Sequence, residues 1–171
     1  VANYHYFMYS DLTPDFLVLD EAHNIEGVLC GILLLLVSSK TMEVIVKIAK
    51  RYHFLKVKPK EVVALVNQIL STEYVDDPRT QKSVEVLGDI LFEIQKLASD
   101  DLAELLKSAG DRLEDSEKKE AKDYANLAGL CNTYIERVST FKDSEIGWVI
   151  SQKSETSIEF KPLRVDKLAS Q

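Results

Sequence analysis

The stretch YANLAGLCNTYIERVSTF, from Tyr124 to Phe141, indicates what kind of fold this chain adopts. Apolar side chains recur in it every three or four residues, which places them along one side of a helix. This stripe consists of Tyr124, Leu127, Cys131, Tyr134 or Ile135, Val138 and Phe141. The spacing predicts a long amphipathic helix that begins near Glu117 and packs its apolar side against other helices.

The same helical spacing extends upstream over most of the chain, so we expect a mainly α fold. Asp77-Pro78 is typical of an N-cap followed by Pro at the first helical position, and Pro59 fits that first position in another helix. Ser99-Asp100-Asp101 predicts the start of a separate short helix, from Leu102 to Ala109. The further stripes are Met42, Ile45, Ile48 or Ala49 and Tyr52; Val62, Leu65 or Val66 and Ile69; and Val84, Leu87, Leu91, Ile94 and Ala98.

Both ends of the chain have a different pattern. Phe16 to Leu19 is a short apolar run, typical of a strand buried in a parallel sheet. Val28 to Val37 is also apolar but is shorter than the roughly 20 residues of a membrane span, so it predicts a buried helix. Beyond the helices the period becomes two, which predicts a β-hairpin. The alternating residues are Ile146, Trp148 and Ile150, then Ile158 and Phe160.

These segments predict three parts. Residues 1–27 are a short piece of an α/β sheet, residues 28–144 a helical domain, and residues 145–171 a returning hairpin and tail. A helical block that follows a buried strand and ends in a hairpin has the layout of an insertion into a larger sheet domain.

Composition limits the function classes. The 171 residues are 46% apolar and carry a net charge of −7, which suits a globular chain with a real core but not a dedicated nucleic-acid binder. A local basic surface remains compatible with this charge. Cys30 and Cys131 have no metal-binding spacing, so we expect two reduced thiols in the core and no zinc or iron–sulfur site on this chain.

The string Asp20-Glu21-Ala22-His23 follows the first apolar run. An NTPase needs one carboxylate to hold Mg²⁺ through its water shell and a second group to orient the attacking water. Two adjacent acids at the end of a buried strand can supply both, and a nearby histidine can sense the γ-phosphate.

LVLDEAHNIEG, from Leu17 to Gly27, resembles motif II of the XPD/DinG-type superfamily-two DNA helicases. Asn3 to Phe7 resembles the element that those proteins carry just upstream, and Phe160 to Val165 resembles the stretch before their next motif. In that family a helical arch domain lies between these points. The resemblance implies an arch-like insertion flanked by a short piece of α/β motor sheet and a C-terminal β-hairpin.

The resemblance also implies site residues and ligands. Asp20 would hold the Mg²⁺ of Mg-ATP through water, Glu21 would be the general base or would position the attacking water, and His23 would couple hydrolysis to movement of the second motor domain. The longer protein would translocate 5′ to 3′ on single-stranded DNA, in the nucleoid or the nucleus, with no membrane. Repair proteins would be further partners.

A phosphate-binding loop is missing from the chain. Lys40-Thr41 lacks the glycines that such a loop needs, so we interpret it as a helix boundary. The family's own loop, and the cysteines of its iron–sulfur cluster, lie upstream of motif II. We therefore expect this chain to be inactive on ATP by itself.

One basic cluster stands out against the acidic composition. Basic residues interleaved with aromatics, here Tyr52 and Phe54, can hold single-stranded DNA by phosphate contact and base stacking. The other interpretation is a solvated helix end with the aromatics in the core. The candidate DNA-binding residues are Lys47, Lys50, Arg51, Lys56, Lys58 and Lys60, with His53 among them.

Two other functions stay open. The sequence is equally compatible with a helical protein-interaction module in which the acids only end a strand, and with a degenerate ATPase that serves as a scaffold. A glycine-rich G-K-T/S motif upstream in the gene would favour the helicase over both.

Overall fold

The computed structural model describes residues 27, 30–31, 33–109, 113–141 and 147–163. The described part is mostly helical, with a small antiparallel sheet, so the mainly α fold is confirmed. Its helices are α3 (Ser39–Arg51), α4 (Pro59–Ser71), α5 (Pro78–Ala109) and α6 (Asp115–Phe141). Its strands are β1 (Leu35–Ser38), β2 (Trp148–Lys153) and β3 (Ser157–Pro162).

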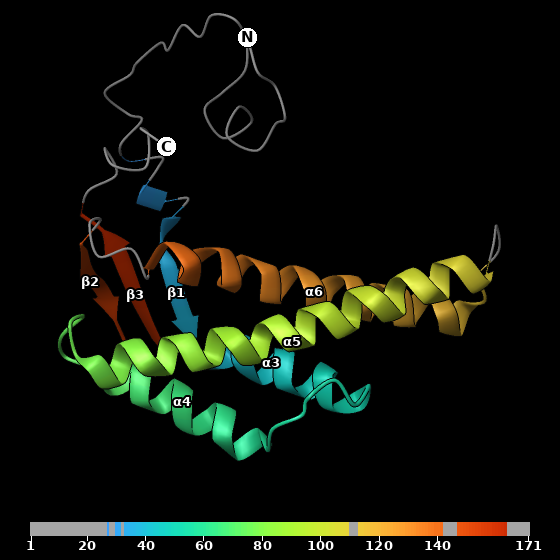
Figure 1. Ribbon diagram of the computed structural model, residues 1–171, viewed down its shortest axis with the longest axis horizontal. Coiled ribbons are helices and arrows are strands. Elements are labelled where there is room, and N and C mark those ends of the chain that lie inside the picture. The colour runs from blue at the N-terminus through green and yellow to red at the C-terminus, as the bar shows by residue number, and fades with distance from the viewer. Residues whose placement is uncertain (1–26, 28–29, 32, 110–112, 142–146, 164–171) are drawn as a thin grey trace, which may run out of the picture.

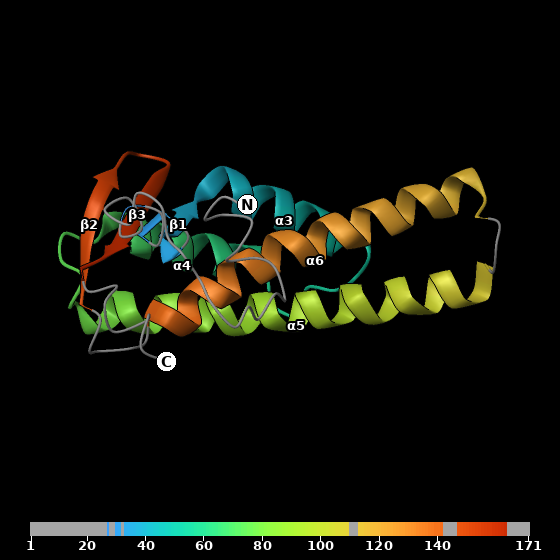
Figure 2. The ribbon, with the colours of Figure 1, turned by 90° about the horizontal axis from the view of Figure 1, so that it is seen from above.

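The long helices α5 and α6 form an antiparallel pair that runs the length of the molecule (Figure 1). The sheet lies at the end of this pair where α5 begins and α6 ends. Helix α4 packs against α5, and α3 packs against both α4 and α6. The view turned by 90° shows the far end of the pair projecting beyond α3 and α4 (Figure 2).

The sheet has the order β1-β3-β2, with antiparallel neighbours throughout. Its central strand, β3, pairs with β1 through Leu35 opposite Phe160 and Val37 opposite Ile158. All four of these side chains are fully buried. The hairpin of β2 and β3 was predicted from its alternation and is confirmed, with a register shift between Ile150 and Gln152.

The predicted helical stripes form one continuous core. Buried members come from every described helix and from the sheet, so helices and sheet fold around the same apolar interior. Where a stripe left two choices, Val66 and Tyr134 are buried while Leu65 and Ile135 are partly exposed. The largest fully buried side chains are Phe160, Leu35, Ile45, Ile69, Leu87, Leu91, Ile94, Leu127 and Ile158.

Local sequence signals fix several helix ends. Asp77 Oδ1 accepts a hydrogen bond from the backbone N–H of Arg79 at 2.9 Å, so the predicted cap of α5 is confirmed. Glu117 reaches back to the N–H of Glu114 at 2.7 Å at the start of α6, which is half of a capping box.

Helix α3 ends in a Schellman motif. The N–H of Phe54 bonds to the carbonyl of Ala49 at 2.8 Å, and the N–H of His53 bonds to that of Lys50 at 3.4 Å. His53 has φ 60, a left-handed conformation that this motif normally gives to glycine.

The separate helix predicted from Leu102 to Ala109 was wrong, because α5 continues without a break through Ser99-Asp100-Asp101. A Ser or Asp cap contributes only about 1 kcal/mol, and packing along a partner helix overrides that preference. Leu102 and Leu105 extend the side of α5 that packs against the core.

The apolar run from Val28 to Val37 was predicted to be a buried helix. This prediction was wrong for the C-terminal end of the run. Residues 35–37 belong to β1 and alternate buried, exposed, buried. Residues 30, 31 and 33 are helical. A short apolar run does not distinguish strand from helix by its period alone, and here the free edge of β3 selects the strand.

The hairpin is also tied to the helices by hydrogen bonds. Lys153 Nζ donates to the carbonyl of Thr72 at the end of α4, at 2.6 Å. The N–H of Ser39, at the start of α3, donates to the carbonyl of Thr156 at 2.9 Å. These bonds join the returning hairpin to the first two described helices.

Cys30 and Cys131 are both buried and unpaired, as expected for core thiols. Lys40-Thr41 lies in the first turn of α3, which agrees with a helix boundary. Within the described ranges, no helix has the length and apolar character to cross a membrane.

Candidate functional site

The predicted catalytic and metal-binding residues Asp20, Glu21 and His23 lie outside the described residues. Their roles, and those of ATP and Mg²⁺, remain predictions from the sequence. Among the residues that the structure describes, no group of three or more His, Cys, Asp or Glu side chains could hold a metal ion. The residues of the basic cluster, in contrast, are described by the structure, so the geometry of this predicted site is known.

Two members of this cluster face acids on the long helices. Arg51 Nη1 lies 2.7 Å from Asp123 Oδ2 on α6, and Lys56 Nζ lies 3.4 Å from Glu93 Oε2 on α5. A hydrogen bond with Tyr52 and the charge of Asp123 raise the pKa of Arg51. These two cations are paired within the chain, which leaves them less available to an external anion.

The aromatic members of the cluster are turned inward. Tyr52 donates its hydroxyl to Asp123 at 2.9 Å and packs edge-on against Tyr124, with ring centroids 4.8 Å apart. Phe54 is only 4% exposed and packs against the same tyrosine. Burial, followed by the bond to Asp123, raises the pKa of Tyr52. These contacts do not support stacking of DNA bases on Tyr52 and Phe54. They support the other interpretation, in which the two aromatic side chains pack into the core.

The remaining lysines are exposed. Lys47 and Lys50 lie on α3, Lys58 is the N-cap of α4, and Lys60 lies in its first turn. None of these four forms an ion pair in the part of the chain that the structure describes. Seven Lys or Arg residues stand against two acids, Glu43 and Glu61, between Ser39 and Ser71. This segment is thus strongly basic in an acidic chain.

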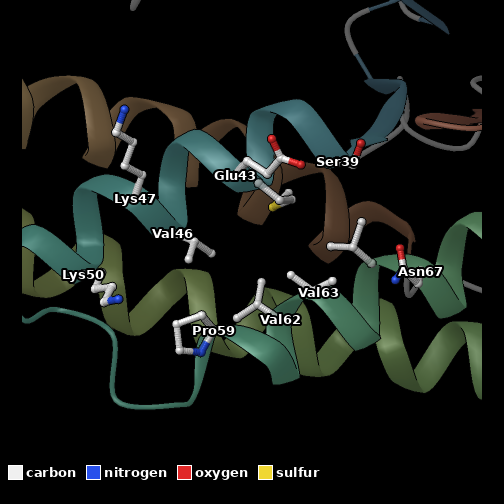
Figure 3. Close-up of a pocket in the computed structure, with 11 residues that line it drawn as sticks. Ser39, Glu43, Val46, Lys47, Lys50, Pro59, Val62, Val63 and Asn67 are labelled. Atoms are coloured by element: carbon white, nitrogen blue, oxygen red, sulfur yellow. The ribbon is translucent and has the colours of Figure 1, made fainter.

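A groove between α3 and α4 passes beside these lysines (Figure 3). Its volume is about 330 Å³. Because the two helices run antiparallel, one end lies at Lys50 and Pro59 and the other at Ser39 and Asn67. Its lining residues are Ser39, Met42, Glu43, Val46, Lys47, Lys50, Pro59, Val62, Val63, Val66 and Asn67.

The floor of the groove is aliphatic. Val46 of α3 faces Pro59 and Val62 of α4 (Figure 3). Val63, which also lines the groove, leaves 50% of its surface exposed, while Met42 among the lining residues is buried. The rim carries the lysines at one end and neutral polar groups at the other, with Glu43 between them. Such a groove can take an apolar group together with a negative charge.

Sequence reasoning found the lysines but missed the floor. Val46 and Val63 lie beside the core stripes of their helices, so each looks like a scattered apolar residue. Only the pairing of α3 with α4 brings them together. One sequence feature could have indicated the floor: both helices carry more apolar residues than a single buried stripe contains.

No known family matched the chain, and no match was found among curated proteins or solved structures. The likeness to XPD/DinG helicases therefore depends on the motif residues of the sequence.

Proposed function

We propose that this chain is the arch-like insertion, with the adjoining motif II, of an XPD/DinG-type ATP-dependent DNA helicase. The DEAH string after a four-residue apolar run supports the motor assignment. The helical block that follows supports the arch.

The observation that carries the proposal is the pairing of β1 with β3. The chain leaves β1 to form the four described helices and returns through the hairpin to the strand next to β1. An inserted domain must begin and end at neighbouring points, because its host is continuous on both sides. This arrangement therefore suits an insertion at one place in a host sheet.

The motif residues have distinct tasks in this proposal. Asp20 would hold the Mg²⁺ of Mg-ATP, and Glu21 would position the attacking water. His23 links the site to the second motor domain. The bound nucleotide supplies the phosphoryl group, but its phosphate-binding loop is not in this sequence, so the chain alone is inactive.

Single-stranded DNA would meet the arch through phosphate contacts. Lys58 and Lys60 have no acidic partner among the described side chains, whereas the aromatics nearby are in the core. Binding through phosphates alone depends steeply on salt and little on base identity. The arch would then guide the strand without reading it.

The motor assignment is tested in the longer protein that the proposal implies. Glu21→Gln should abolish ATP hydrolysis stimulated by single-stranded DNA, with ATP binding retained. Glu26→Gln is the matched control, because it removes an acid from the same stretch. Full ATPase activity in Glu21→Gln, or the lack of a G-K-T/S motif upstream, would refute the helicase assignment.

The DNA contact is tested on this chain. Fluorescence anisotropy with labelled oligothymidine, at low and at moderate salt, should give salt-sensitive binding that Lys58→Glu combined with Lys60→Glu removes. Lys119→Glu combined with Lys122→Glu is the matched control, because both residues are exposed on α6 and, like Lys58 and Lys60, form no ion pair among the described side chains. Equal binding by the two double variants would place the DNA elsewhere.

A further inference from the structure

We infer that the groove between α3 and α4 is a docking site for an acidic amphipathic segment of a partner protein. The segment would place an apolar side on the valine floor and acidic side chains beside Lys47 and Lys50. This inference goes beyond the proposed helicase function and does not depend on it.

The floor indicates an apolar ligand. Val46, Pro59, Val62 and Val63 lie along the groove from two helices, and Val63 is half exposed. Removing apolar surface from water lowers the free energy, so a partner side chain that covers Val63 would stabilise the complex. A volume of about 330 Å³ suits a few aliphatic side chains.

The rim indicates the charge of that ligand. Lys47 and Lys50 line the groove, and Lys58 and Lys60 flank Pro59 at the same end. Glu43 is the single acid among the lining residues. Acidic groups on the partner would complement this end, which speeds association and selects against basic segments.

The groove suits a peptide better than a nucleic acid. Single strands are held by phosphates together with aromatic side chains on which bases stack. None of the lining residues is aromatic, and Tyr52 and Phe54 pack into the core instead. Aliphatic floors beside charged rims are what amphipathic helices use when they dock in grooves.

Charged and neutral polar lining residues lie at opposite ends of the groove. The lysines cluster where α3 ends and α4 begins, while Ser39 and Asn67 mark the neutral end. We therefore expect a segment whose acidic side chains flank its apolar side at one end, where they would meet the lysines.

The probe is a labelled synthetic peptide with leucines on one helical side, glutamates on the other and extra glutamates at one end. Its anisotropy is followed as the full 171-residue chain is added. A peptide of the same composition in scrambled order tests the need for an apolar side, and labelled oligothymidine tests the nucleic-acid alternative.

Two pairs of variants separate floor from rim. Val63→Gln alters the floor, and Val44→Gln is its control because Val44 is 44% exposed on α3 but does not line the groove. Lys50→Glu alters the rim, and Lys40→Glu is its control on the same helix. All four positions are exposed, so each variant should keep the urea midpoint of the parent chain.

The expected result is binding of the amphipathic peptide that Val63→Gln weakens about fivefold and Lys50→Glu weakens about tenfold. The two controls should bind like the parent. Equal binding of the scrambled peptide, or no effect of Val63→Gln, would overturn the inference. So would a result in which only oligothymidine binds, because the lysines would then serve phosphates alone.

Discussion

Leu35 of β1 and Phe160 of β3 lie opposite each other in the sheet, and neither side chain has exposed surface. The pair closes the helical block, since the four described helices lie between these two residues in the sequence. Phe160 also packs against Phe141 at the end of α6, with ring centroids 5.2 Å apart. Sheet and helices therefore share one core at this point.

Replacing Phe160 should destabilise the whole domain and not only the hairpin. Phe160→Ala is expected to lower the free energy of unfolding by about 3–5 kcal/mol, because it leaves a cavity between sheet and helices. Lys161→Ala, on the exposed side of the same strand, should change it by less than about 0.5 kcal/mol. Urea unfolding measures both.

The same titration tests whether the core is shared. Trp148 is the single tryptophan and lies on β2, whereas circular dichroism follows the helices. The two signals should give one midpoint in the parent chain and in Phe160→Ala. Separate midpoints would mean that the sheet unfolds independently of the helices.

Stability should fall in alkali because of Cys131. Burial raises the pKa of this thiol from 9.0 to about 12. Above pH 9 the unfolded chain loses the thiol proton while the folded chain keeps it, so folding weakens as pH rises towards 12. The expected loss from this group is roughly 1.4 kcal/mol between pH 8 and 10.

Cys131→Ala isolates this effect. The variant should start less stable at pH 8, and its deficit relative to the parent should shrink by roughly 1.4 kcal/mol at pH 10. Burial also raises the pKa of Tyr52, Tyr124 and Tyr134, so both proteins should weaken further above pH 10. An unchanged deficit between pH 8 and 10 would contradict a buried neutral thiol.

The end of α3 offers a stabilising change. His53 is exposed and has φ 60, where a Cβ atom is strained and glycine is not. His53→Gly should stabilise the chain by about 0.5–1 kcal/mol in thermal or urea unfolding. His53→Ala keeps the Cβ and should give no gain. If alanine stabilised as much as glycine, the imidazole and not the backbone would be the cause.

The sequence predicted the helices well because each has a buried stripe with helical period. The helices that contain Val84 to Ala98 and Tyr124 to Phe141 could be predicted without knowing which elements they pack against. The period alone could not reveal β1, since its four residues continue an apolar run and become a strand only by pairing with β3. The continuity of α5 past Ser99 depends in the same way on α6.

The candidate site was predicted only in part for a related reason. Position along the sequence grouped six cations, but three-dimensional packing directs Arg51 towards Asp123 and Lys56 towards Glu93. It also turns Tyr52 inward. The groove joins residues of two helices, so no single stretch of sequence could show it. The acids of motif II have a sequence signal, and their geometry lies outside the described residues.

The close approach of α5 and α6 at Gly88 gives the last prediction. A Cβ built on Gly88 would lie 3.1 Å from Cγ1 of Val138, which is tighter than ordinary contact. Val138 is buried, and its β-branched side chain has one favoured rotamer in a helix, so it yields poorly. Gly88→Ala should therefore destabilise the chain by roughly 0.5–1 kcal/mol, despite the better helix propensity of alanine.

A double-mutant cycle checks the physical reason. In a Val138→Ala background the crowding is absent, and Gly88→Ala should instead stabilise by about 1 kcal/mol, the ordinary propensity gain. The coupling between the two sites would then be roughly 1.5–2 kcal/mol, measured from four urea titrations. If Gly88→Ala stabilised both backgrounds equally, the helices would have room for a methyl group, and Gly88 would not be needed for their close packing.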